Sequence, residues 1–167
     1  MKQVAIVMED AKDWAYGKSA AVILKNFSAP YSANVISPFR TPARILEFSG
    51  RAKTENVGVI ICVSGPTAHL SGGMAASTTL PVIAVPVHSD ERGDTMNVAT
   101  YTQTPNGVPV ATVGSCENAA LLALQILALS DEKLSQSLAI FKQTATDSLI
   151  EADFMLQQEI GQEIGQL

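Results

Sequence analysis

Short, continuous apolar runs alternate along this chain with segments whose apolar residues recur every three or four positions. The runs predict strands that are buried on both faces, and the recurring positions predict amphipathic helices. The expected strands span residues 4–8, 31–36, 57–63, 81–86 and 108–113. Because strands that alternate with helices pair in parallel through right-handed crossovers, the pattern predicts an α/β fold built as a three-layer sandwich.

The helices between these strands are predicted from their apolar stripes. In the first helix the stripe consists of Trp14, Gly17, Ala20, Ala21, Leu24 and Phe27. The second helix opens at Thr41-Pro42, with Thr41 as the expected N-cap and Pro42 at the first helical position. Its expected inner face consists of Ile45, Leu46, Phe48 and Ala52. A further helix is expected over residues 117–129, and a glycine-rich loop over residues 64–73. The polar segment 89–106 has room for a short helix.

The C-terminal tail carries one long apolar stripe at helical spacing. Its members are Leu134, Leu138, Phe141, Ala145, Leu149, Ala152 and Leu156. A helix after the last strand has little sheet left to cover. Residues 131–167 are therefore predicted to be a helical extension that packs on a neighbouring subunit, outside an α/β domain of residues 1–130. The alternative is a helix that folds back on its own domain.

Composition favours a subunit of an assembly. The chain has 167 residues, enough for one domain, of which 47% are hydrophobic and only 16% charged. A free monomer normally shows more charge, so part of the surface is expected to lie between identical subunits. The net charge of −5 without a basic cluster argues against nucleic-acid binding. No apolar run reaches the roughly 18 residues that a membrane span requires.

The two cysteines indicate a reducing compartment. The start of the chain leads directly into a strand, so no signal peptide is expected, and Cys62 and Cys116 are interpreted as reduced thiols of a cytoplasmic protein. Cys116 lies at an expected helix start, where a thiol pKa can be lowered. The favoured interpretation of Cys116 is nevertheless a small buried side chain.

In open parallel sheets, ligands bind beyond the carboxyl ends of the strands. Here these ends lead into Glu9-Asp10, residues 37–41, residues 64–73 and the segment from Val87 onward. The chain has no glycine motif of the kinds that bind nucleotide phosphates, no zinc-ligand spacing and no serine nucleophile elbow. A small-molecule site is therefore expected at these four loops.

Six blocks of residues carry a family resemblance, in order and at nearly the expected spacing. They are Val4–Met8 with Asp13-Trp14, Ser37-x-x-Arg40-Thr41-Pro42, Ala68-His69-Leu70 with Met74-Ala75-Ala76, Pro81–Ile83 with Val85–Val87, Pro105-x-Gly107–Thr112, and Asn118–Ala128. Together they resemble the PurE family of purine biosynthesis over roughly residues 3–145. The resemblance implies a flavodoxin-like parallel sheet in a homo-octamer, with a long C-terminal helix that reaches a neighbour.

The same resemblance implies a reaction on a small nucleotide. Most members move a carboxylate from N5 to C4 of aminoimidazole ribonucleotide, which makes them isomerases. A second class carboxylates the ribonucleotide directly with CO2. Neither class needs a metal or an organic cofactor, and neither implies a nucleic-acid or membrane partner.

The resemblance also implies a set of substrate-binding residues. They are Asp13, Ser37, Arg40, Gly65, Ala68 and Leu70. Arg40 would hold the substrate phosphate, and its alternative role is an ion pair with a nearby Glu or Asp. Asp13 matches the ribose-binding aspartate of the family, and its alternative role is to cap the first helix.

The catalytic positions depart from the family pattern. The family's catalytic histidine falls on Phe39, which cannot carry a proton, and Glu9-Asp10 replaces a Gly-Ser pair that lets phosphate approach. Proton transfer would then fall to His69, which the family also has, or to His88, which replaces a family glutamine. The alternative for each histidine is a structural role.

Two further loops differ from the family. Val63 and Pro66 replace glycines and are expected to narrow the pocket, and residues 113–118 form a connection about four residues shorter than the family's. Two hypotheses therefore remain. The chain is either a divergent carboxylate-transfer enzyme, or a retargeted or non-catalytic relative that binds a different small molecule.

Overall fold

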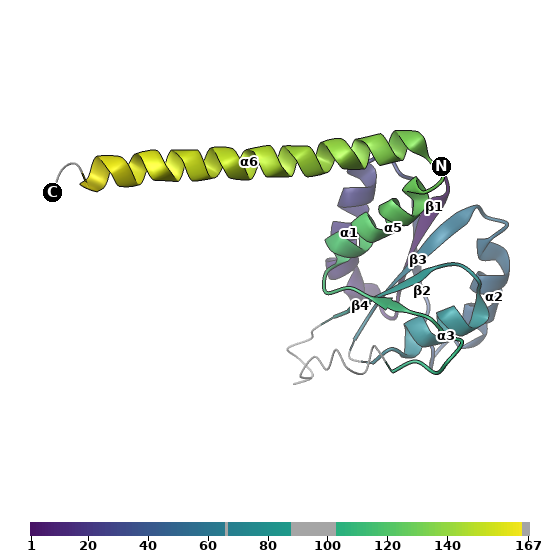
Figure 1. The fold of residues 1–167 in the computed structure, drawn as a ribbon. Helices are drawn as coiled ribbons and strands as arrows, with labels where there is room; N and C mark the ends of the chain where they lie inside the picture. The colour runs from purple at the N-terminus through teal and green to yellow at the C-terminus, as the bar shows by residue number, and fades with distance from the viewer. Residues whose placement is uncertain (66, 88–102, 165–167) are drawn as a thin grey trace.

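The computed structural model describes residues 1–65, 67–87 and 103–164 and consists of one parallel sheet with helices on both faces (Figure 1). The strands are β1 (Gln3–Met8), β2 (Tyr31–Val35), β3 (Val57–Ser64), β4 (Val82–Pro86) and β5 (Ala111–Thr112). They pair in parallel in the order β2-β1-β3-β4-β5. The predicted three-layer α/β fold with a flavodoxin-like sheet is confirmed.

The helices form the outer two layers. They are α1 (Trp14–Asn26), which follows the short 3-10 helix η1 (Ala11–Asp13), then α2 (Ala43–Ala52), α3 (His69–Ser77), α5 (Cys116–Ala128) and α6 (Glu132–Ile164). Helices α1 and α5 share the core of one sheet face with the start of α6. Helices α2 and α3 share the core of the other face.

Central strand β3 shows why continuous apolar runs mark this sheet. All eight of its residues are buried. Ile61 and Val63 face the core shared with α1 and α5, whereas Ile60 and Cys62 face the core shared with α2 and α3. Successive side chains of a strand point to opposite faces. In a strand covered on both sides, nearly every position therefore faces a core and favours an apolar residue.

The expected glycine-rich loop 64–73 is wrong in its second half, because α3 begins at His69. Gly73 in this segment suits a close approach to α2. A Cβ on Gly73 would lie 3.2 Å from Cδ1 of Ile45, and the Ser49 hydroxyl donates to the Met74 sulfur at 3.2 Å. Packing on α2 thus outweighs the low helix propensity of glycine.

Two further expectations need correction. Strand β5 has only two residues rather than the span 108–113, because Val108 donates its N–H to the carbonyl of Pro105 in a turn and Pro109 has no N–H to donate. On α2, Ile45, Phe48 and Ala52 are buried as predicted, but Leu46 is 68% exposed. It lies next to Ile45 in sequence, and neighbouring residues on a helix face different directions.

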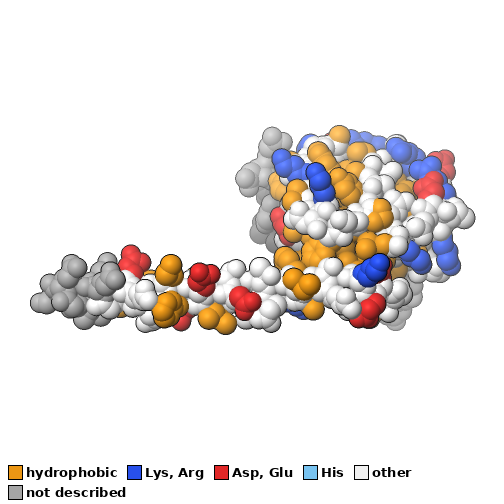
Figure 2. Space-filling model, turned by 90° about the horizontal axis from the view of Figure 1, so that it is seen from above, with side chains coloured by type: hydrophobic (Ala, Val, Ile, Leu, Met, Phe, Trp, Pro, Cys, Tyr) orange, Lys and Arg blue, Asp and Glu red, His pale blue; other side chains and the backbone are white. Residues whose placement is uncertain are grey.

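Helix α6 leaves the body after its first turns (Figure 1). Leu134 and Leu138 are buried in the core beside α5, and the ring of Phe141 meets that of Phe27 edge-on at 5.5 Å. Hydrophobic side chains continue along the rest of the helix (Figure 2). Those exposed there are Leu149, Ile150, Phe154, Met155, Leu156 and Ile160. Within the described ranges, none of the helices has the length and apolar character to cross a membrane.

Candidate functional site

Arg40 ties together the first two loops at the carboxyl edge of the sheet. Its Nη2 donates to the main-chain carbonyl of Glu9 and to Oδ2 of Asp10, both at 2.9 Å. Its Nε donates to the Ser37 hydroxyl at 3.3 Å. The ion-pair role that the sequence left open for Arg40 is therefore the one seen, although 62% of the Arg40 side chain is exposed.

Asp10 and Asp13 form a reciprocal cap on η1. The N–H of Asp10 donates to Oδ2 of Asp13 at 3.0 Å, and the N–H of Lys12 donates to Oδ1 of Asp10 at 3.2 Å. The backbone N–H of Lys12 and the guanidinium of Arg40 hold the pKa of Asp10 below its ordinary value. Asp13 is buried and does not cap α1 with its side chain, so its capping role concerns the preceding 3-10 turn.

Ser37 is the buried centre of the second loop. Its hydroxyl accepts the N–H of Arg40 at 3.2 Å, besides the contact from the guanidinium. Thr41 was expected to cap α2, but its hydroxyl turns back to Ser37, accepting the N–H at 3.0 Å and donating to the carbonyl at 3.2 Å. The side chains of residues 37–41 therefore stiffen the loop instead of serving the helix.

The second and third loops meet through an aromatic contact. The rings of Phe39 and His69 lie edge to face with their centroids 4.9 Å apart. Phe39 is 69% exposed, and His69, the first residue of α3, is also exposed. The residue at the family's catalytic position is thus in contact with the one described histidine of the site.

Residues of the third loop differ in how they could serve a ligand. Gly65 lies where an added Cβ would be 2.6 Å from the Val87 carbonyl oxygen, so its lack of a side chain serves the approach to β4. Ala68 is half-buried just before α3, and Leu70 is fully buried in the core. Any contact of Leu70 with a ligand would be indirect, through the position of His69. Pro66 and His88 lie outside the described residues.

Two small cavities border this edge. One of about 320 Å³ is lined by Thr67–His69, Gly72-Gly73 and residues 103–105. The other, of about 290 Å³, lies at the carboxyl end of β4 and is lined by residues of α1, Val85–Val87 and residues 114–117. His69 therefore contacts Phe39 and also lines a cavity with room for a small group.

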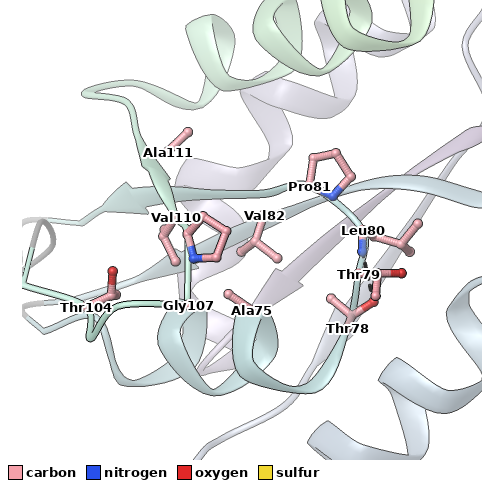
Figure 3. A pocket seen from close by; sticks show the side chains of 11 residues that line it. Ala75, Thr78, Thr79, Leu80, Pro81, Val82, Thr104, Gly107, Val110 and Ala111 are labelled. Atoms are coloured by element: carbon pink, nitrogen blue, oxygen red, sulfur yellow. Dashed lines mark hydrogen bonds between the residues drawn. The ribbon is translucent and has the colours of Figure 1, made fainter.

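A cavity of about 820 Å³ lies elsewhere, at the amino ends of β4 and β5 (Figure 3). It is lined by Ala75, Thr78–Val82, Thr104, Gly107 and Pro109–Ala111. None of these lining residues is ionisable. Among the described residues, the cavity therefore has no ionisable group that could move a proton, and it lies at the edge opposite to the one where ligands of parallel sheets bind.

The start of α5 carries two titratable groups beside the second small cavity. Burial and the neighbouring Glu117 carboxylate raise the pKa of Cys116 to about 11, so the reactive-thiol interpretation is wrong and the buried small side chain is confirmed. The backbone N–H of Glu117 itself and the hydroxyls of Ser19 and Ser115 lower the pKa of Glu117. Across the described parts of the chain, no three His, Cys, Asp or Glu side chains are grouped to hold a metal.

The role of Asp10 is the feature that the sequence left unrecognised. The two acidic residues after β1 were interpreted only as groups that repel phosphate, whereas Asp10 is the ion-pair partner of Arg40. Parallel neighbours β1 and β2 end at the same edge, so their first loop residues lie side by side. Opposite charges in the loops that follow two neighbouring strands are the signal that could have predicted this pair.

Comparisons with known proteins agree on one family. The family model described as AIR carboxylase matches residues 3–148. A protein named N5-carboxyaminoimidazole ribonucleotide mutase from Saccharolobus solfataricus is 38% identical over 152 residues, 90% of this chain and 96% of the relative. The protein of the same name from Escherichia coli is 39% identical over 153 residues, 89% and 90% of the two chains. The crystal structure of Treponema denticola PurE matches with a TM-score of 0.84 and 25% identity, covering 90% of this chain and 96% of that one.

Proposed function

The chain belongs to the AIR carboxylase family, as its motifs predicted, and we propose that it transfers a carboxylate on an aminoimidazole ribonucleotide or a close relative of that compound. The observation that carries the proposal is the family match over residues 3–148. Relatives named as mutases of N5-carboxyaminoimidazole ribonucleotide align over nearly their whole length. The activity is then that of an isomerase, or of a carboxylase that uses CO2 directly.

The proposed chemistry requires one proton to move. When the carboxylate leaves N5 and a bond forms from its carbon to C4, the proton on C4 must leave and N5 must regain one. Phe39 cannot accept a proton, whereas the neighbouring imidazole of His69 can. We assign the transfer to His69, with His88 as the second candidate from the sequence.

The other predicted residues would place the substrate next to His69. Ser37 and Arg40 hold the second loop in one conformation, and Asp13 fixes the first loop through the Asp10 N–H. Gly65 and Ala68 give the third loop small residues at two positions before His69. A preorganised set of loops of this kind favours catalysis, because little reorganisation is needed when the substrate binds.

The test is an assay of the purified full chain with N5-carboxyaminoimidazole ribonucleotide that carries a 13C label in its carboxylate. We expect NMR to show the label on C4, and we expect His69→Asn to lower kcat by roughly 10²–10⁴-fold, as loss of an acid/base group does. The matched control is Glu55→Gln, an exposed residue paired with Arg51 before β3. A wild-type chain that neither interconverts nor decarboxylates the labelled compound would refute the proposal for this substrate.

The alternative from the sequence is a relative that binds another small molecule without this chemistry. It rests on Phe39 and on the acidic pair Glu9-Asp10, and the comparisons add nothing to it. Restored growth of a purine-requiring strain that expresses the chain would count decisively against it. If the strain is not rescued, the variant with the three changes Glu9→Gly, Asp10→Ser and Phe39→His should be tested in the same strain. Restored growth would show that these three residues alone account for the missing activity.

We propose further that the chain forms a cytoplasmic homo-octamer in which residues 131–167 pack on a neighbouring subunit. Support comes from the exposed apolar side chains of α6 beyond Phe141, since exposed patches of this kind mark subunit contacts. Cys62 and Cys116 are free and buried, in keeping with a reducing compartment. Sedimentation equilibrium is expected to give eight chains per particle, whereas a monomer would contradict the assembly.

A further inference from the structure

The strongest unassigned feature of the carboxyl edge is that the Arg40 guanidinium already makes hydrogen bonds within the chain. Its guanidinium makes hydrogen bonds to the Glu9 carbonyl, the Asp10 carboxylate and the Ser37 hydroxyl. The Asp10 carboxylate in turn accepts the Lys12 N–H, and its own N–H is held by Asp13. Asp10 is therefore held by hydrogen bonds on two sides and paired with Arg40.

The carboxylate in contact with this guanidinium is that of Asp10, whose Oδ2 lies 2.9 Å from Nη2 of Arg40. Two further acidic residues, Glu9 and Asp13, belong to the same stretch of chain. A phosphate monoester carries between one and two negative charges near neutral pH. Bound at the exposed part of the Arg40 guanidinium, it would lie beside the Asp10 carboxylate, and like charges at such distances repel.

A neutral group has no such conflict. A hydroxyl can accept a hydrogen bond from the exposed part of the guanidinium while the contact between Arg40 and Asp10 stays intact. The Lys12 N–H does not compensate for this repulsion, because the Asp10 carboxylate already accepts it.

We propose that Asp10 is a specificity-determining residue that makes this site prefer a ligand with a neutral group, such as the free 5′-hydroxyl of a nucleoside, over a ligand with a phosphate there. The inference rests on the proposed function for the aminoimidazole part of the ligand. It concerns a different part of the molecule, the end that meets Arg40.

The test uses two stable compounds that differ only in the phosphate, 5-aminoimidazole-4-carboxamide ribonucleoside and its 5′-phosphate. Calorimetry on the full wild-type chain should give a nucleoside affinity equal to or higher than that of the nucleotide. In Asp10→Asn we expect nucleotide affinity to rise about tenfold, since one unit charge beside the phosphate is removed, with nucleoside affinity changed by less than about twofold. Glu55→Gln, which removes the acid of the exposed pair with Arg51, should change neither affinity.

Two additional measurements make the result specific to Arg40. The gain should vanish in the double variant Asp10→Asn with Arg40→Gln. Inorganic phosphate alone should bind Asp10→Asn more tightly than the wild type, which tests the pair even where neither imidazole compound binds. A wild type that binds the nucleotide more tightly than the nucleoside, or an Asp10→Asn variant with no gain for either phosphate probe, would overturn the proposal. The proposed function is tested separately by turnover. A chain that is inactive on both the phosphorylated and the dephosphorylated substrate would contradict the proposed function. The measured affinities would still decide the role of Asp10.

Discussion

The interior of the sheet and its carboxyl edge are built in opposite ways. In β3 all eight residues are buried and almost all are apolar. At the edge, Phe39 is 69% exposed and the Arg40 side chain 62% exposed, and the loops are joined by hydrogen bonds, an ion pair and one ring contact. The interior is therefore held by burial of apolar side chains, whereas the edge is held by polar and ring contacts between loops, several of which involve exposed groups.

This difference teaches how one fold can carry altered chemistry. Burial of apolar surface supplies most of the stability of a domain, and contacts between exposed charges supply little. Residues 9, 10 and 39 can therefore depart from the family pattern without loss of the fold. A relationship visible in the core and a changed substrate preference at the loops are physically compatible.

The largest expected effect lies in the interior. Ile61 on β3 is fully buried and its registry partners are Ile6 on β1 and Ile83 on β4. We expect Ile61→Ala to lower the free energy of unfolding by about 2–5 kcal/mol, because it removes buried methyl groups and leaves a cavity between packed strands. Denaturation in urea at a fixed chain concentration measures this loss, since an assembly makes stability depend on concentration.

The matched control is Leu46→Ala on α2. The Leu46 side chain is 68% exposed, so its removal should change the free energy of unfolding by no more than roughly 0.5 kcal/mol. A loss at Leu46 as large as that at Ile61 would mean that subunit contacts cover this face. Interior and surface residues would then have to be defined from their burial in the assembly, not in the single chain.

The interior was also the part that the sequence predicted well. Continuous apolar runs identified β1, β3 and β4, because a strand covered on both faces needs an apolar residue at every position. The stripe of α1 was predicted for the same kind of reason, and only Trp14 in it is exposed, whereas the cap expected from Thr41 at the start of α2 was wrong. The prediction that Leu46 is buried was wrong, because apolar character alone does not determine which way a helical residue faces.

The edge could be located but not described from the sequence. The rule on strand ends gave the right loops, yet the contacts Arg40–Asp10 and Phe39–His69 join residues about thirty positions apart. Periodicity carries no information on contacts of this kind. The start of α3 at His69 was missed because Gly72 and Gly73 disfavour a helix locally, and packing against α2 and the sheet stabilises it.

A smaller effect is expected where the interior meets the edge, at Gly65. A Cβ there would lie 2.6 Å from the carbonyl oxygen of Val87, a backbone atom that cannot rotate away, and the Val87 N–H is bound to the Ser64 carbonyl at 3.0 Å. We expect Gly65→Ala to cost about 1–3 kcal/mol of unfolding free energy, as other insertions into packed sites do. The forced shift starts four residues before His69, so the assay with labelled N5-carboxyaminoimidazole ribonucleotide should also show a reduced kcat.

Gly50 on α2 gives the matched comparison for that change. Nothing lies within 4 Å of a Cβ added at Gly50, so Gly50→Ala should raise the free energy of unfolding by up to about 1 kcal/mol through helix propensity alone. The same chemical change is thus expected to have opposite signs at the two glycines. If Gly65→Ala were as stable and as active as the wild type, the approach of Gly65 to Val87 would not constrain the loop. The edge would then be independent of the interior even at the point where the third loop leaves β3.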